Sequence, residues 1–301
     1  MSDETSRLVW SDSYEVDIGD HVFPTAKYGL VKDQLLAAGI ITPDHLVGPQ
    51  PADSGMLGLV HEAEYLEKIR SGGFSDSEIR IMEVPFSAAY REASIVSAGA
   101  TTEAGRIALR TGTGVHLGGG FHHAFAGHGE GFCMINDVAV AAMTLLRDDA
   151  AERIAIVDLD VHHGNGTATI FADEPRVFTF SMHHQWNYPA LKPPSDLDVG
   201  LDDGMGDEEY LRLLDEHLPT VLEQQPDVIF YLAGADPFQE DQLGGLALTK
   251  DGLRARDEAV LTAAGGAGVP VAVTLAGGYA IKLMDTVDIH CATVEAALGP
   301  R

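Results

Sequence analysis

Three polar side chains follow a run of apolar residues in the segment IAIVDLDVHHGNG, residues 154–166. Asp158, Asp160 and His162 are spaced two residues apart, so in an extended chain they point to the same face. Two carboxylates and an imidazole at the end of a buried strand are costly unless they pair or bind a metal ion. A hydrogen-bonded cluster would account for one such pair, but three polar groups in register favour a metal site.

A second apolar run, residues 228–234, leads directly to Asp236. An Asp-Pro pair can be an ordinary turn, but a carboxylate that follows a buried parallel strand would enter the same crevice. Asp160, His162 and Asp236 would then bind one ion and leave a position for water and substrate, as in catalytic zinc sites. Zn²⁺ is the expected ion, and Fe²⁺ or Co²⁺ would also suit these donors.

An adjacent histidine pair, His122 and His123, stands in the glycine-rich segment GGGFHHAFAGHGEGF. Paired imidazoles near a metal-bound water suit proton transfer, because their pKa lies near neutrality. Each ring needs a partner that fixes its tautomer, and Asp158 and Asn165 are the candidates.

A tyrosine, Tyr279, follows the apolar run at residues 269–276 in the motif TLAGGYA. A tyrosine hydroxyl aimed at the metal would stabilise an oxyanion. The motif by itself fits equally a tyrosine that packs at the end of a strand.

The elements that must position these groups can be predicted from the hydrophobic pattern. Nearly continuous apolar runs are typical of strands buried on both faces of a parallel sheet, and they occur at residues 8–10, 114–117, 154–160, 177–181, 228–234 and 269–276. Helices are expected at residues 25–38, 61–70, 88–110, 137–147, 207–224, 250–264 and 281–298. Pro219 should kink or split one of them, and residues 183–206 are expected to be irregular. This alternation predicts an α/β three-layer fold, with a mostly parallel sheet flanked by helices. No linker or repeat divides the chain, so one domain is expected over residues 1–301.

The composition excludes several classes of partner. The 301 residues include 46 Asp and Glu but 19 Lys and Arg, which gives a formal net charge of −27. Without a basic run, neither nucleic acid nor an anionic membrane is expected as a partner. No apolar run approaches the roughly 18 residues of a membrane span, and the acidic start of the chain does not resemble a signal peptide. Two cysteines, Cys133 and Cys291, fit a reducing cytoplasm, where we expect the protein.

Five motifs in order make the sequence similar to the histone deacetylase superfamily of zinc amidohydrolases: GGGFHH, GEGFCMIND, DLDVHHGNG, GADPFQEDQLGGLALT and AGGY. The resemblance begins at the segment HVFPTAKYGLVKDQLL and extends to the C-terminal helix. The compact length, the triple glycine before FHH, and the run Arg256-Asp257-Glu258 resemble class IV and its bacterial relatives most.

The resemblance implies the arginase/deacetylase fold and a role for each candidate residue. It assigns zinc to Asp160, His162 and Asp236. His123 resembles the general base and acid, and His122 resembles its electrostatic partner, oriented by Asp158. Tyr279 resembles the oxyanion donor.

Further residues are implied by the family alone. The walls of an acyl-lysine tunnel would be Gly131, Phe132 and Tyr188. Members of the family also hold a structural potassium ion, and its ligands here would be Asp158, Asp160, His162, Ser181 and Met182, partly through backbone carbonyls.

Three departures from the family pattern stand out. Asn165 occupies the position where class I members carry Asp, and it is a weaker electrostatic partner for His123. The last glycine motif begins with Ala276 in place of glycine. The rim carboxylate that holds the peptide backbone in class I enzymes has no match, which leaves the carrier of the acyl group open.

The expected activity is deacetylation or longer-chain deacylation of acyl-lysine, and three alternatives stay open. Acetylpolyamines or small acyl amines would undergo the same chemistry. A ureohydrolase with two metal ions would need more bridging carboxylates, but Gly164 and Phe238 stand where they would be. A catalytically silent module that binds acylated ligands is the remaining alternative. The oligomeric state is open, and Met182, Trp186 and Tyr188 would shape either a pocket or an interface.

Overall fold

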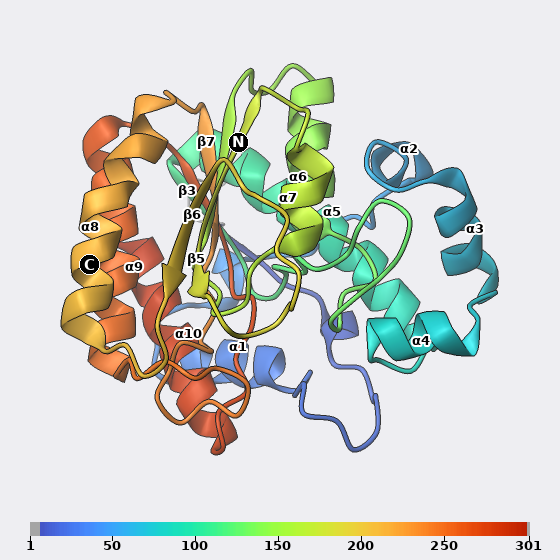
Figure 1. The fold of residues 1–301 in the computed structure, drawn as a ribbon, viewed down its shortest axis with the longest axis horizontal. Coiled ribbons are helices and arrows are strands. Elements are labelled where there is room, and N and C mark those ends of the chain that lie inside the picture. Colours follow the sequence, from blue (N-terminus) through green and yellow to red (C-terminus); the bar gives the residue numbers. More distant parts are fainter. Residues whose placement is uncertain (1–6, 300–301) are drawn as a thin grey trace.

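One sheet of eight parallel strands runs through the computed structural model, which describes residues 7–299 (Figure 1). The strands are β1 (Leu8–Val9), β2 (Leu46–Val47), β3 (Thr113–His116), β4 (Ile154–Asp158), β5 (Val177–His184), β6 (Leu197–Leu201), β7 (Val228–Leu232) and β8 (Val271–Thr274). They lie in the order β2-β1-β3-β8-β7-β4-β5-β6. Every neighbouring pair is parallel, which confirms the predicted α/β fold.

Helices cover both faces of the sheet (Figure 1). One face carries α1 (Lys27–Ala37), α8 (Asp207–Glu223), α9 (Lys250–Ala267) and α10 (Leu283–Leu298). The other face carries α5 (Ala88–Thr111), α6 (Asp137–Arg147) and α7 (Asn165–Phe171), with α2 (Ser54–Leu57), α3 (Ala63–Ser71) and α4 (Asp76–Met82) beyond them. No helix of residues 7–299 is long and apolar enough to cross a membrane.

The central strands β4 and β7 are buried along their whole length, as their apolar sequences require between two helical layers. Asp158, the last residue of β4, pairs in register with Ser181 of β5 and Leu232 of β7. The carboxyl ends of these strands therefore meet at one edge of the sheet, where open α/β folds place their ligands.

The observed elements differ from the sequence prediction where local signals are weak. The strand expected at residues 154–160 ends at Asp158, so Asp160 and His162 lie in the loop that follows. Residues 183–206 are not wholly irregular, because β5 continues to His184 and β6 forms at Leu197–Leu201. Pro219 does not split α8, which stays one helix. The short elements β2, α2, α4 and α7 were not predicted, since each is too brief to show a period.

Candidate active site

Asp160, His162 and Asp236 lie together beyond the carboxyl ends of β4 and β7, each with a ligand atom within 4.8 Å of the others'. His162 Nδ1 is 3.0 Å from Asp160 Oδ1 and 3.3 Å from Asp236 Oδ2. All three side chains are buried, and Asp236 Oδ2 has no hydrogen-bond partner among residues 7–299. Two buried carboxylates around one imidazole, with one oxygen unsatisfied, are a donor set that fits a divalent cation.

The electrostatics of this cluster favour a positive charge between the carboxylates. Burial lowers the pKa of His162, but the nearby carboxylates of Asp160 and Asp236 outweigh burial and raise that pKa to about 10. Burial and the nearby Asp160 raise the pKa of Asp236 to about 6. The residues therefore fit Zn²⁺, and the same donors suit Fe²⁺ or Co²⁺.

Hydrogen bonds that involve backbone atoms hold the cluster in place. Gly277 N donates to Asp160 Oδ2 over 2.8 Å. A Cβ at position 277 would lie 2.0 Å from Asp236 Oδ2, so a side chain there would collide with that carboxylate. Arg256, fully buried on α9, donates to the carbonyl oxygens of Leu159 and Gly234 at 3.3 and 2.6 Å. One guanidinium thus ties together the two loops that carry the carboxylates.

The histidine pair faces this cluster, and each ring has the partner that the sequence suggested. His122 Nδ1 is 2.6 Å from Asp158 Oδ2, and His123 Nδ1 is 2.7 Å from Asn165 Oδ1. The Nε2 atoms of the two rings are 3.1 Å apart, and His122 Nε2 is 3.8 Å from Asp160 Oδ1. Both imidazoles are therefore fixed at Nδ1 and present Nε2 to the site.

The two imidazoles differ in charge. Burial lowers the pKa of His122, but the carboxylates of Asp158 and Asp160 outweigh burial and raise that pKa to about 9. Burial, together with the charges of His122 and His162, lowers the pKa of His123 well below its usual range. The surroundings therefore favour the charged form of His122 and the neutral form of His123.

Tyr279 approaches the cluster from the loop after β8. Its ring centroid is 6.4 Å from that of His162, and its backbone N donates to Asp241 Oδ2 over 2.6 Å. Burial and the charges of Asp160 and Asp236 raise the pKa of Tyr279 well above its usual range. The hydroxyl therefore keeps its proton and can donate a hydrogen bond.

The three residues expected to line a tunnel lie around His123. Gly131 and Phe132 line the pocket that also contains His123 and Tyr279. The ring of Tyr188 meets that of His123 edge to face, with centroids 4.9 Å apart. The Phe132 and Tyr279 rings, which both line this pocket, have centroids 5.9 Å apart.

Two carboxylates that position the site were missed by the sequence analysis. Glu130 accepts hydrogen bonds from Asn165 Nδ2 at 2.7 Å and from the Tyr188 hydroxyl at 2.9 Å. Asp137, buried at the start of α6, accepts from the backbone N of Phe121 at 2.7 Å and so fixes the loop before the histidine pair. Both lie within the GEGFCMIND motif, but a single carboxylate in a loop carries no spacing signal of its own.

The residues expected to bind potassium lie on adjacent segments. Asp158 and Ser181 are paired on β4 and β5, Met182 follows Ser181, and Asp160 and His162 follow β4. Their ligation of K⁺ stays a prediction.

Comparison with known proteins gives the class and then the family. The fold of this chain is similar to that of the crystal structure of the HDA15 HD domain. That structure superposes with a TM-score of 0.80 at 23% identity, over 98% of this chain and 91% of the other. The family model for the histone deacetylase domain matches residues 21–294.

Curated relatives agree with that match. An uncharacterised protein of Picosynechococcus is 43% identical over 96% of this chain and 97% of its own length. Histone deacetylase 2 of Arabidopsis thaliana is 31% identical over 90% of this chain and 74% of its own length. The acetoin utilization protein AcuC of Staphylococcus aureus is 31% identical over 76% of this chain and 64% of its own length. The chain belongs to the histone deacetylase family.

Proposed function

We propose that this chain is a zinc-dependent hydrolase that removes an acetyl or longer acyl group from the side-chain amine of lysine. The observation that carries the proposal is the convergence of three kinds of group in one pocket. His123 and Tyr279 line the pocket together with Asp160 and His162. Asp236 completes the cluster.

Asp160, His162 and Asp236 are the residues that would hold the ion. When bound, Zn²⁺ would polarise the acyl carbonyl and lower the pKa of a water molecule toward about 7. The unsatisfied oxygen of Asp236 supports this assignment.

The remaining residues would move the proton and hold the developing charge. His123, neutral and fixed by Asn165, would take a proton from the attacking water and return it to the leaving amine. His122, charged and fixed by Asp158, would stabilise the negative charge nearby. The Tyr279 hydroxyl would donate to the oxyanion of the tetrahedral intermediate.

We propose in addition a class within the family, a structural ion and a cellular location for this chain. The compact chain and its motifs favour class IV and its bacterial relatives, with a structural K⁺ at Asp158, Asp160, His162, Ser181 and Met182. Both cysteines are free and buried, which suits the cytoplasm.

A binuclear ureohydrolase is disfavoured by the cluster itself. Within residues 7–299, the ligand group around His162 consists of two carboxylates and one imidazole. A second ion in the same site would need further bridging carboxylates.

The test is release of a fluorophore from acetyl-lysine and long-chain acyl-lysine reporters by the zinc-loaded chain, with a chelated sample as control. Chelator-sensitive turnover is expected, and the preferred reporter identifies the acyl group. Absence of turnover on both reporters, with zinc bound, would overturn lysine deacylation. Acetylpolyamines would then be tried next, because the charge of −27 attracts a cationic carrier.

A further inference from the structure

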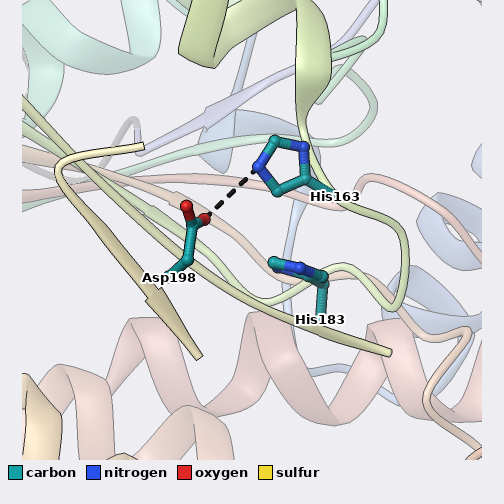
Figure 2. A group of neighbouring side chains, drawn as sticks. All are labelled: His163, His183 and Asp198. Atoms are coloured by element: carbon teal, nitrogen blue, oxygen red, sulfur yellow. Dashed lines mark ion pairs between the residues drawn. The ribbon is translucent and has the colours of Figure 1, made fainter. Parts of the chain in front are cut away.

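His163, the neighbour of His162, belongs to a different cluster. His163 is fully buried and lies with His183 and Asp198, each with a ligand atom within 4.8 Å of the others'. Figure 2 shows the Asp198 carboxylate facing the ring of His163, with the ring of His183 beside them. None of these three residues takes part in the proposed hydrolysis.

The sheet register brings this cluster together. Ser181 of β5 pairs with Asp198 of β6, so their side chains share a face of the sheet. His183 lies two residues after Ser181 and therefore points to that same face. His163 reaches the cluster from the loop between β4 and α7.

One distance between ligand atoms matches the spacing expected in a tetrahedral metal site. His163 Nε2 is 3.3 Å from Asp198 Oδ1. Metal–ligand bonds of about 2.0–2.1 Å that meet at the tetrahedral angle separate their ligand atoms by roughly 3.3–3.4 Å. The rings of His163 and His183 meet edge to face with centroids 4.6 Å apart.

The outer hydrogen bonds leave one ligand atom free on two of the residues. His183 Nδ1 is 2.9 Å from Ser181 Oγ, which leaves Nε2 for an ion. Asp198 Oδ2 accepts from Ser195 N over 2.9 Å, which leaves Oδ1. Metal-binding histidines typically hydrogen-bond through the second ring nitrogen in this way.

We propose that His163, His183 and Asp198 form a second metal site, which takes Zn²⁺ or a similar divalent transition-metal ion. An ordinary ion pair would use one imidazole and the carboxylate, and it would leave the second buried imidazole without a function. Two imidazoles favour zinc over K⁺ or Mg²⁺, which prefer oxygen ligands. The Asp198 side chain is 33% exposed, so water can reach the fourth position and the ion has a path of entry.

An ion at this site would be structural. It would join the loop after β4, the end of β5 and the start of β6. The segment between β5 and β6 carries Tyr188, whose ring packs against His123. The second site would therefore brace the segment that holds Tyr188 against His123.

The test is a zinc count by mass spectrometry after the chelated chain has been dialysed against buffered Zn²⁺. Asp198→Asn keeps an oxygen for Ser195 N but removes the charged ligand, and it should bind one equivalent less than the wild type. Asp203→Asn is the matched control. Asp203 Oδ1 also lies 3.3 Å from a histidine, His184 Nε2, but among residues 7–299 that pair does not belong to a group of three possible ligands. The Asp203→Asn variant should bind as much zinc as the wild type.

Only the difference between wild type and Asp198→Asn bears on this site, so the outcome is independent of whether the chain deacylates lysine. Equal zinc in the two chains would overturn the proposal. Should Asp198→Asn not fold, anomalous diffraction at the zinc edge from wild-type crystals decides. A peak within bonding distance of His163, His183 and Asp198 is expected, and its absence at full occupancy of the His162 cluster would overturn the second site.

Discussion

His162 and His163 are neighbours in the chain, yet they belong to two clusters built from the same residue types. Around His162, two buried carboxylates share the pocket with His123 and Tyr279. Around His163 there is a second imidazole and a partly exposed carboxylate, and the hydroxyls of Ser181 and Ser195 lie within hydrogen-bond distance of the two histidines. Both sets of donors suit an ion, but only the first, within residues 7–299, has the proposed base His123 and the proposed oxyanion donor Tyr279 beside it. The neighbours of a metal site, more than its ligands, decide whether it performs chemistry.

The existence of two separate clusters affects how the number of metal ions bound per chain is interpreted. Two ions per chain would ordinarily suggest a binuclear active site. Here the two ions would belong to separate clusters, and the variant that loses an ion identifies which cluster held it.

Arg256→Met should have the largest effect, on stability. Arg256 is fully buried and pairs with Asp257 at 2.8 Å, besides holding the two loops of the His162 cluster. Removing one partner of a buried ion pair costs about 3–5 kcal/mol. Arg254→Met on the same helix breaks an exposed pair with Glu258 and should cost less than about 1 kcal/mol. Urea unfolding of both chains measures the contrast, and equal costs would contradict the role given to Arg256.

Tyr279→Phe should lower turnover by about 10²–10³, the usual cost of one oxyanion donor. The zinc content should stay that of the wild type, because the hydroxyl is not a metal ligand in this account. Initial rates on the preferred acyl-lysine reporter, with zinc measured on the same sample, make the check. A folded, zinc-loaded variant with wild-type turnover would remove Tyr279 from the mechanism.

Asn165→Ala should lower turnover by about 10–100-fold, the range for a group that orients a reacting residue. The variant removes the partner of His123 Nδ1 at 2.7 Å. Asn165→Asp restores the acceptor for His123 Nδ1 but places a carboxylate against Glu130, to which the wild-type amide donates, so it should recover part of the activity. If the alanine and aspartate variants turned over equally fast, positioning through Asn165 would be refuted.

Asp198→Asn should have the smallest effect on turnover, less than about tenfold, because its cluster acts through a neighbouring loop. Its melting temperature should no longer rise when Zn²⁺ is added beyond the amount that fills the His162 cluster, since binding to the folded state alone stabilises it. Thermal unfolding at increasing Zn²⁺ checks this expectation. If the melting temperature of Asp198→Asn rose with added Zn²⁺ as much as that of the wild type, the expectation would be contradicted.

The central strands and the long helices were predictable because their apolar runs and amphipathic periods are local signals. The strands β4 and β7 lead directly to the carboxylates of the His162 cluster, so that cluster could be assembled from strand ends alone. The partners of His122 and His123 followed from the same segment, since Asp158 and Asn165 lie on either side of the metal motif.

The second cluster was not predictable, because it depends on register. His183 and Asp198 lie in a stretch expected to be irregular, and β6 is a short edge strand whose sequence LDVGL gives no continuous apolar run. Only the pairing of Ser181 with Asp198 brings the two residues near His163. Arg256 was likewise noticed as a motif, but its contacts with Leu159 and Gly234 required the tertiary structure.

The most direct test of the central claim is turnover of the acyl-lysine reporter by Asp236→Asn, compared with the wild type during zinc titration of the chelated chains. Wild-type turnover should rise as the His162 cluster fills. The variant should stay inactive at every zinc concentration while retaining the zinc of the second cluster. Turnover by the variant comparable with that of the wild type would contradict the assignment of the active site.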